Sequence, residues 1–320
     1  MRSTLLAATA TATICLGTIP ALAETVFTTL GTEGGPVTAP KRGQPSNLLT
    51  VNGSQTLVDV GDGTAQRLSQ LALQAGQIEN VVITHLHFDH TAGLLGVLGL
   101  RFQTDFARPL RVYGPPGTDV LVKGLIDGMA PAMEANYGVP GERSYTANQL
   151  VEVHVVKSGD TFQLGDIKIT AVQNTHYSFE PGSPKADKFQ SLSYRFETPD
   201  KVIAVTGDTG PSAEVEKLAK NADILVGEMI DLPLTVETMR NIASRIAPER
   251  FEGMKIHLST HHLAPSDLGK LAANAEAKQL VVTHLAPGGL MTDETTKAYV
   301  AEIGRYFSGK ITIANDMDRF

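Results

Sequence analysis

The sequence predicts a single domain of mixed α and β structure, and three observations lead to this prediction. Short runs rich in β-branched residues recur from residue 47 onward, and stretches with apolar residues at helical spacing lie between several of them. Glycine (30 residues) and proline (17 residues) are frequent, as expected when turns join many short elements. No repeat and no low-complexity linker divides residues 24–320, so we expect one domain over this range.

The first 23 residues differ in composition from the rest of the chain. Arg2 precedes an apolar, alanine-rich run that is too short to span a bilayer comfortably. The small residues Ala21 and Ala23 fit signal-peptidase cleavage before Glu24. We therefore expect a signal peptide over residues 1–23 and a periplasmic or secreted protein without a membrane anchor, with a buried N-terminal helix as the alternative.

Cysteine usage and charge limit the chemistry of the remaining chain. Cys15 is the only cysteine, and the bulky Ile14 before it does not fit a lipoprotein signal. After cleavage, a metal ion would therefore be held by His, Asp and Glu alone. The formal net charge of −7, from 27 basic and 34 acidic residues, comes without a run of Lys or Arg. A general nucleic-acid binder is disfavoured because its affinity is largely electrostatic.

Local patterns place the elements along the chain. Two β-rich runs within residues 47–63 flank Asn52-Gly53, which predicts a hairpin. Residues 64–76 have helical apolar spacing and end at glycine, which predicts a helix. Further strands are expected at 80–85, 110–114, 150–156, 167–173, 192–198, 201–207 and 223–228, and further helices at about 212–220, 235–246, 266–276 and 293–306.

Two stretches look like insertions that border a cleft. Residues 128–149 are rich in Gly, Pro and Tyr without clear periodicity, and residues 231–253 are mostly helical in pattern. With Tyr137 and Tyr145, the first insertion is a hypothetical lid over a substrate.

The segment THLHFDH, residues 84–90, holds three of the nine histidines directly after a buried strand. His85 and His87 are two residues apart, so in an extended segment their rings point the same way. Asp89 and His90 follow where the chain turns toward a helix. Such a loop fits two cations about 3.5 Å apart, one on each pair of side chains. Zn²⁺ suits imidazole and carboxylate ligands, and Mn²⁺ or Fe²⁺ accept the same set; a chance cluster of surface histidines is the alternative.

Further ligand-type residues follow later strands. A histidine comes after the strand in AVQNTH, an aspartate after VIAVTG, and a histidine at the end of QLVVTH. Taken singly, each is more often structural. Together with the loop they make the number of groups that two metal ions with a shared carboxylate need, namely His85, His87, Asp89, His90, His176, Asp208 and His284.

These motifs, in this order, resemble the metallo-β-lactamase superfamily. The stretches LGTEGGP (30–36), LVDVGDGTAQRL (57–68) and GKITIANDMDRF (309–320) are similar to its tRNase Z and arylsulfatase-type branch. The resemblance covers nearly the whole mature chain. It implies an α+β fold, an αββα sandwich of two mixed β-sheets flanked by helices, with two divalent metal ions at one sheet edge. It also implies that one ion is held by His85, His87 and His176, the other by Asp89, His90 and His284, and that Asp208 bridges them.

Two adjacent cations would lower the pKa of a bridging water toward neutrality, so that hydroxide becomes the nucleophile. They would also stabilise the negative charge that develops on an ester under attack. Asp89 or Asp208 could hold the hydroxide by a hydrogen bond. Asp59, in LVDVGDG, is a candidate acceptor that orients one of the histidines, and a simple turn carboxylate is the alternative.

A leaving group also needs a proton, and His262 is the candidate donor. It lies 22 residues before His284, and the tRNase Z-like branch has a histidine at a similar distance that assists the leaving oxygen or the developing oxyanion; a capping or surface role is the alternative. Here His-Leu-Ala replaces the usual His-Ser-Thr, which looks more like the arylsulfatase-type relatives. Glu228 would pair with His262 and raise its pKa. His261 is the second candidate for this role, whereas a structural role is expected for His154 and His257.

The predicted reaction is hydrolysis of a phosphodiester or sulfate ester in a small-molecule substrate, with a lactone or acyl ester as the alternative. A true β-lactamase is disfavoured because members with that activity usually lack the bridging aspartate that Asp208 supplies. A non-catalytic metal-binding protein is disfavoured because no ligand is lost. tRNA is disfavoured as a partner by the export signal and by the short segment between His176 and Asp208. The sequence leaves the oligomeric state open, although relatives often form homodimers.

Overall fold

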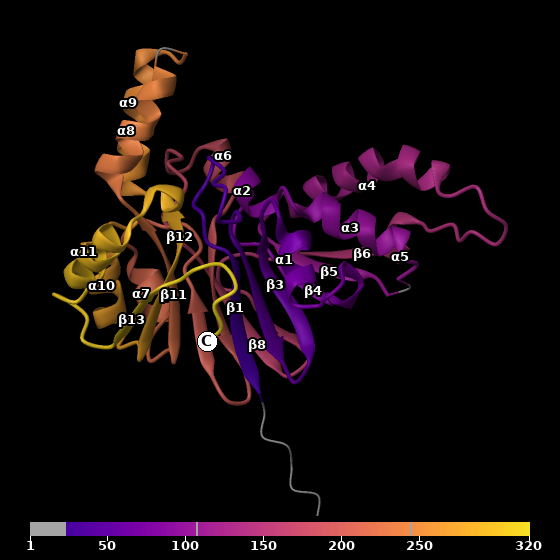
Figure 1. The fold of residues 1–320 in the computed structure, drawn as a ribbon, viewed down its shortest axis with the longest axis horizontal. Coiled ribbons are helices and arrows are strands. Elements are labelled where there is room, and N and C mark those ends of the chain that lie inside the picture. Colours follow the sequence, from indigo (N-terminus) through magenta and orange to yellow (C-terminus); the bar gives the residue numbers. More distant parts are fainter. Residues whose placement is uncertain (1–23, 107, 244) are drawn as a thin grey trace, which may run out of the picture.

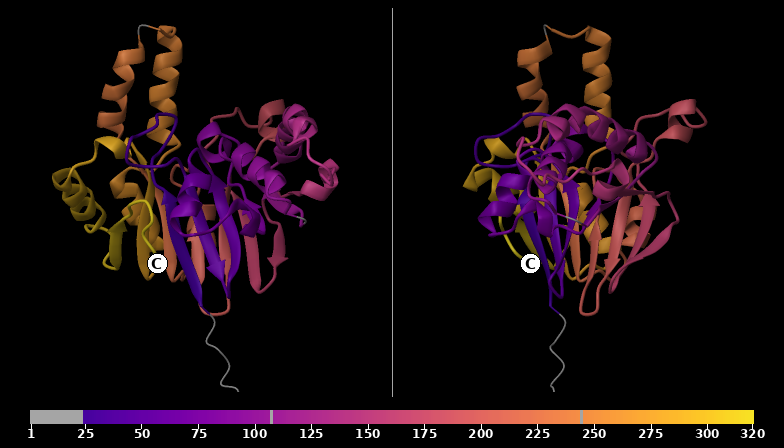
Figure 2. Two further views of the ribbon diagram at one scale, coloured as in Figure 1. Left: turned by 45° about the vertical axis from the view of Figure 1, so that its right-hand side comes forward. Right: turned by 90° about the vertical axis from the view of Figure 1, so that its right-hand side faces the viewer.

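The computed structural model describes residues 24–106, 108–243 and 245–320. The predicted signal peptide, residues 1–23, lies outside the described residues. Two β-sheets pack against each other, and helices cover both outer faces (Figures 1 and 2). The predicted αββα sandwich is therefore confirmed.

The first sheet combines antiparallel and parallel strands. Its strand order is β1 (Thr25–Gly31), β2 (Ser46–Val51), β3 (Ser54–Val60), β4 (Asn80–Val82), β5 (Leu110–Gly114) and β6 (Val151–Val155). Strands β1 to β3 are antiparallel, and β3 to β6 are parallel. The β2–β3 hairpin turns at Asn52 (φ 51°) and Gly53 (φ 85°), the two positive φ angles that make Asn-Gly a hairpin turn.

The second sheet has the same mixed character. Its strands are β7 (Thr161–Leu164), β8 (Ile167–Gln173), β9 (Leu192–Glu197), β10 (Val202–Val205), β11 (Ile224–Ile230), β12 (Gln279–Ala286) and β13 (Lys310–Ile313), in the order β13-β12-β11-β10-β9-β8-β7. Strands β7 to β10 are antiparallel, and β10 to β13 are parallel. The carboxyl ends of β10, β11 and β12 therefore lie at one edge, where ligands bind in such sheets.

Helices fill the outer layers. On the first sheet these are α1 (Thr64–Gln70), α2 (Phe88–Thr91), α3 (Leu94–Gln103), α4 (Thr118–Ala135) and α5 (Ala147–Leu150), with the 3₁₀ helix η1 (Ala75–Gln77). On the second sheet they are α7 (Ala213–Leu218), α10 (Pro265–Asn274) and α11 (Asp293–Ile303), with η2 (Gly288–Leu290); α6 (Pro184–Lys188) lies between β8 and β9 in the chain. None of the helices in the described part of the chain is long and apolar enough to cross a membrane.

Three apolar clusters hold these layers together. The central cluster joins the inner faces of the two sheets and includes Phe27, Val58, Tyr194 and Phe196, each fully buried. The second packs α1, α3 and α4 on the first sheet, and the third packs α7, α10 and α11 on the second. Tyr194 also donates its hydroxyl to Ile83 O at 2.9 Å, which ties the second sheet to the strand end that precedes the histidine loop.

The predicted helix over 64–76 is too long. Helix α1 ends at Gln70, and Ala72 adopts φ 57°. The amide of Leu73 donates to Leu68 O at 3.0 Å, the hydrogen bond of a helix that ends in a left-handed residue. Glycine usually occupies the left-handed position after a helix, so with alanine at position 72 the first visible stop signal was Gly76.

The two predicted insertions have different structures. Helix α4 runs through the first part of 128–149, and the rest packs beside the end of α3: Tyr145 Oη lies 3.4 Å from Asp105 Oδ1. In Figure 1 this segment extends sideways from the first sheet. None of its described hydrogen bonds reaches a predicted metal ligand, so they give the lid hypothesis no support.

The second insertion forms helices α8 (Leu232–Ala243) and α9 (Pro248–Thr260), which stand side by side above the sheet edge (Figures 1 and 2).

Candidate metal centre

The histidine loop is held at the carboxyl end of β4 by Asp59. This carboxylate accepts the Thr84 amide at 2.8 Å and the Thr84 hydroxyl at 2.9 Å, and it lies 2.8 Å from Nδ1 of His90. Asp59 is 3% exposed and adopts φ 60°, a left-handed conformation that Asp and Asn tolerate better than most residues. The contact expected between Asp59 and one of the histidines is therefore present, and its role in orienting that histidine stays a prediction.

Three other predicted ligands come from the second sheet. His176 follows β8, and Asp208 follows β10. His284 lies within β12 rather than at its end: Thr283 pairs with Glu228 and Leu285 with Met229, so His284 is an extra residue in the ladder, with φ 45°. Such a bulge redirects a side chain, here toward the sheet edge.

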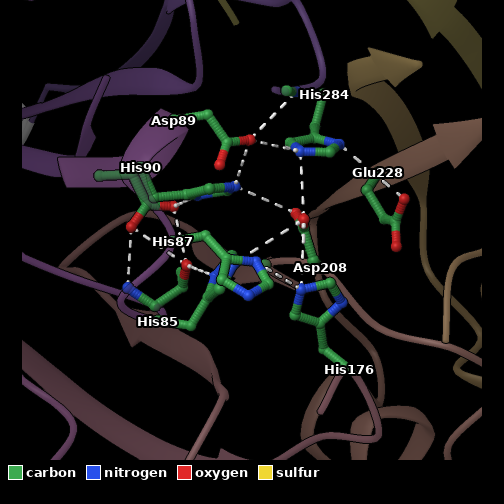
Figure 3. A network of polar contacts seen from close by, with 12 residues as sticks. His85, His87, Asp89, His90, His176, Asp208, Glu228 and His284 are labelled. Carbon is green, nitrogen blue, oxygen red and sulfur yellow. Dashed lines mark hydrogen bonds and ion pairs between the residues drawn. The ribbon is translucent and has the colours of Figure 1, made fainter. Parts of the chain in front are cut away.

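The other six predicted ligands lie around Asp208 (Figure 3). Its carboxylate lies 3.1 Å from Nε2 of His284 and 3.3 Å from Nε2 of His90. The same carboxylate lies 3.8 Å from Nε2 of His85 and 3.8 Å from Nε2 of His176. Side chains more than 100 residues apart in the chain thus share one small volume.

The ligand atoms divide into two groups that fit two cations. One group is His85, His87 and His176, and the other is Asp89, His90, Asp208 and His284; within each, the ligand atoms lie within 4.8 Å of one another. Nε2 of His85, His90 and His284 is buried and makes no hydrogen bond of adequate geometry in the described part of the chain, although Nε2 of His90 and of His284 lies close to the Asp208 carboxylate. Buried polar atoms are normally hydrogen-bonded, so three unpartnered nitrogens at one point fit metal ligands.

The pKa values at the centre follow from burial and crowded charge. Burial lowers the pKa of His85 well below its ordinary value. Although burial alone would lower the pKa of His284, the carboxylates of Asp208 and Asp89 raise it to about 10. Although burial would raise the pKa of Asp208, His284 and His90 hold it well below its ordinary value. The ionised carboxylates therefore attract positive charge, which a proton or a metal cation can supply.

Two contacts that position the loop have no signal in the histidine motif itself. The Gly35 amide donates to Asp89 Oδ2 at 3.0 Å, and a Cβ at Gly35 would lie 2.1 Å from that oxygen. The Leu86 amide donates to Tyr177 Oη at 3.1 Å. Gly35 belongs to the LGTEGGP stretch, which was noted for its family resemblance. The sequence did not show why a glycine is needed there. Tyr177, next to His176, gave no signal.

The predicted pair of Glu228 and His262 is present beside the centre. Nδ1 of His262 lies 2.9 Å from Glu228 Oε2, and the Thr209 amide donates to Glu228 Oε1 at 2.9 Å. His262 is 7% exposed and Glu228 is 1% exposed. Although burial would lower the pKa of His262, the Glu228 carboxylate raises it.

The remaining histidines lie at different distances from the centre. His154 stacks on Tyr113 with ring centroids 4.5 Å apart, consistent with a structural role. Nδ1 of His261 contacts Thr175 O. The structural role expected for His257 stays a prediction; its ring centroid lies 5.2 Å from that of His176 and 5.5 Å from that of His262. Burial, with neighbouring His262 and His261, lowers the pKa of His257 to about 4.

Comparison with known proteins gives a consistent assignment. Residues 55–285 match the family described as "Beta-lactamase superfamily domain", a range that includes all seven predicted ligands. Ribonuclease Z of Mycobacterium bovis (strain BCG / Pasteur 1173P2) is 29% identical over 297 residues, which cover 92% of this chain and 96% of that protein. Ribonuclease Z of Mycobacterium marinum is 28% identical over 296 residues, which cover 92% and 97%.

Solved structures show the same fold. The metallo-β-lactamase fold protein YhfI from Bacillus subtilis superimposes with a TM-score of 0.65 at 18% identity, covering 92% of this chain and 98% of that one. The short form of human tRNase Z superimposes with a TM-score of 0.60 at 22% identity, also covering 92% and 98%.

Proposed function

The chain belongs to the beta-lactamase superfamily domain family, and from this premise we propose that it is a binuclear metal-dependent hydrolase of phosphodiester bonds in small substrates. The observation that carries the proposal is the gathering of seven His and Asp side chains, Asp208 among them, with three buried nitrogens that make no hydrogen bond in the described residues. A shared carboxylate between two nitrogen-rich groups supports a pair of cations rather than one.

The ligand atoms fit zinc best. Imidazole nitrogen and carboxylate oxygen without thiolate suit Zn²⁺, and Mn²⁺ or Fe²⁺ accept the same set. His85, His87 and His176 would hold one ion, and Asp89, His90 and His284 the other, with Asp208 between them. When bound, the two ions would lower the pKa of a shared water toward neutrality and neutralise charge on an ester oxygen.

The surrounding residues supply orientation and a proton. Asp89 is fixed by the Gly35 amide and Asp208 by the histidines around it, so either carboxylate can accept a hydrogen bond from the attacking water. Nδ1 of His262 pairs with the Glu228 carboxylate, which raises the pKa of His262 and so favours the charged ring that carries a proton on both nitrogens. We assign His262 as the acid that protonates the leaving oxygen, and Glu228 as the residue that holds it in place.

The phosphodiester assignment rests on the relatives named ribonuclease Z. A sulfate ester presents a similar tetrahedral anion, so it remains within the proposal. Hydrolysis of a lactone or acyl ester would use the same metal ligands and is the alternative.

RNA is the second candidate substrate, and the relatives' name favours it over the small ester. Against it stand the net charge of −7 and the short connection between His176 and Asp208. That connection contains the five-residue helix α6 and strands β9 and β10, so it leaves little length for a basic arm. A small ester therefore agrees better with this chain.

Export remains part of the proposal. Cleavage before Glu24 predicts a mature N-terminus at that residue, and N-terminal sequencing of the protein from its native source tests this directly. An intact residue 1 on the native protein would contradict export.

The homodimer likewise stays a proposal, which sedimentation of the metal-loaded protein tests.

A substrate panel tests the proposed activity. Metal-loaded protein is assayed on bis-(p-nitrophenyl) phosphate, p-nitrophenyl sulfate, a simple lactone, a β-lactam and a short RNA. We expect the phosphodiester to be hydrolysed fastest, and a loss of rate in the Asp208→Ala variant. Preference for the lactone would support the alternative, and preference for the RNA would support the second candidate. No turnover of any member by fully loaded protein would contradict the proposal.

A further inference from the structure

The hairpin of α8 and α9 brings one histidine to the edge of the metal centre. His257 lies in the last turn of α9, and α9 ends at the base of the hairpin (Figures 1 and 2). Its ring nitrogen, one from His176 and one from His262 lie within 4.8 Å of one another. The ring centroid of His257 is 5.2 Å from that of the proposed ligand His176, against 4.9 Å for the proposed acid His262.

The ring of His257 is held in a fixed orientation. Its Nδ1 lies 2.8 Å from the Ser178 hydroxyl, and its ring stacks on His261 with centroids 5.4 Å apart and an interplanar angle of 24°. His261 in turn contacts Thr175 O through Nδ1. If the Ser178 hydroxyl donates to Nδ1, the other nitrogen of His257 carries the hydrogen.

That other nitrogen has no hydrogen-bond partner among the residues that the structure describes, since the recorded contact of His257 uses Nδ1. Packing in a hydrophobic core does not explain why a histidine occupies position 257 either, because α9 has no buried residue. Nε2 of His262 is likewise without a described partner, since Nδ1 binds Glu228. A ring nitrogen of each of these two histidines lies within 4.8 Å of one from His176, and the second nitrogen of each is left free to contact a bound group.

We propose that His257 is a substrate-binding residue, whose Nε2–H, set by Ser178, donates a hydrogen bond to an oxygen of the bound phosphate ester beside His262. This inference rests on the proposed hydrolase function and adds the inserted hairpin to the substrate site. The hairpin then selects for esters with an oxygen on the His176 side of the centre.

Phosphate binding tests the inference without relying on turnover. Inorganic phosphate is titrated into metal-loaded protein by calorimetry, for the wild type, His257→Ala, His257→Gln and Ser178→Ala. We expect roughly tenfold weaker binding for His257→Ala, as for a lost hydrogen bond to a charged group. His257→Gln should recover much of the affinity because its amide nitrogen reaches the same point, and Ser178→Ala should lie between the two.

The matched control is Ile256→Ala, one residue away on α9 and 63% exposed, which should bind phosphate as the wild type does. Metal content and melting temperature are measured for every variant. Unchanged phosphate affinity in His257→Ala with full metal content would overturn the inference. So would a Gln variant no better than Ala together with a lowered melting temperature, because that pattern belongs to a structural contact.

The same samples separate this inference from the proposed function. Phosphate binding that depends on His257, in a protein that hydrolyses no ester of the panel, would support the binding site and contradict the hydrolase. Hydrolysis of bis-(p-nitrophenyl) phosphate with kcat and KM indifferent to His257 would support the hydrolase and overturn the inference.

Discussion

At the scale of single residues, the centre depends on side chains that hold the ligands as much as on the ligands themselves. Asp59 fixes both the Thr84 amide and Nδ1 of His90. From the sequence, this role was one of two hypotheses for Asp59. The other was a simple turn carboxylate, because carboxylates are common before turns. It could not indicate the contact of Gly35 with Asp89, since that depends on two loops that meet only in the folded chain.

Replacing Asp59 tests this support. Asp59→Ala leaves a buried amide and a buried ring nitrogen without an acceptor, which should lower the free energy of unfolding by about 1–3 kcal/mol. Metal affinity should fall roughly 10- to 100-fold, as when a partner of a metal-bound histidine is removed. Chemical denaturation and metal titration measure the two effects. Asp62→Ala, at an exposed position in the same turn, is the control, and equal metal affinity in both variants would contradict the role.

Replacing Glu228 tests the assignment of His262 as the acid. His262 must be protonated to donate, so activity falls as the pH rises through its pKa. The Glu228 carboxylate holds that pKa above the value that burial alone would give. Glu228→Gln should therefore move the descending limb of the pH–rate profile to lower pH, by about one unit. The exposed Glu237→Gln should leave the limb in place, and an unmoved limb in Glu228→Gln would argue against the assignment.

At the scale of elements, strands with strong β patterns were predicted nearly to the residue, as for β5 and β8. Helix α4 was not predicted, because Pro131 and several glycines interrupt its apolar pattern. The bulge at His284 was also not predicted. It arises from pairing between β11 and β12, and such cross-strand register leaves no trace in the pattern of one strand.

The segment after α4 gives an element-scale prediction. Its described contacts are with the end of α3, as between Tyr145 and Asp105, rather than with the centre. Replacing residues 137–144 by a short Gly-Ser linker should therefore leave metal content, kcat and KM for small esters unchanged. A changed KM with unchanged metal content would restore the lid hypothesis.

At the scale of the whole molecule, each sheet supplies part of the ligand set. The loop after β4 in the first sheet provides four ligands, and the second sheet provides His176, Asp208 and His284. Bound metal would therefore join the two halves of the sandwich. The order of motifs in the sequence predicted this arrangement through the family resemblance, whereas the spacing alone predicted only which groups would meet.

Metal removal should accordingly destabilise the fold. A ligand present at 100 times its Kd stabilises the folded state by about 2.7 kcal/mol, so chelation should lower the melting temperature by several degrees, and added Zn²⁺ should restore it. Calorimetry with and without chelator measures the change. Identical melting curves for the loaded and chelated protein would show that metal does not bridge the sheets.

The most direct test of the central claim is elemental analysis of the purified protein beside its Asp208→Ala variant. A centre in which Asp208 joins two ligand groups predicts about two transition-metal ions per chain in the wild type and a loss of both in the variant. Wild-type protein without bound metal after incubation with Zn²⁺, or a variant that retains the full complement, would contradict the account.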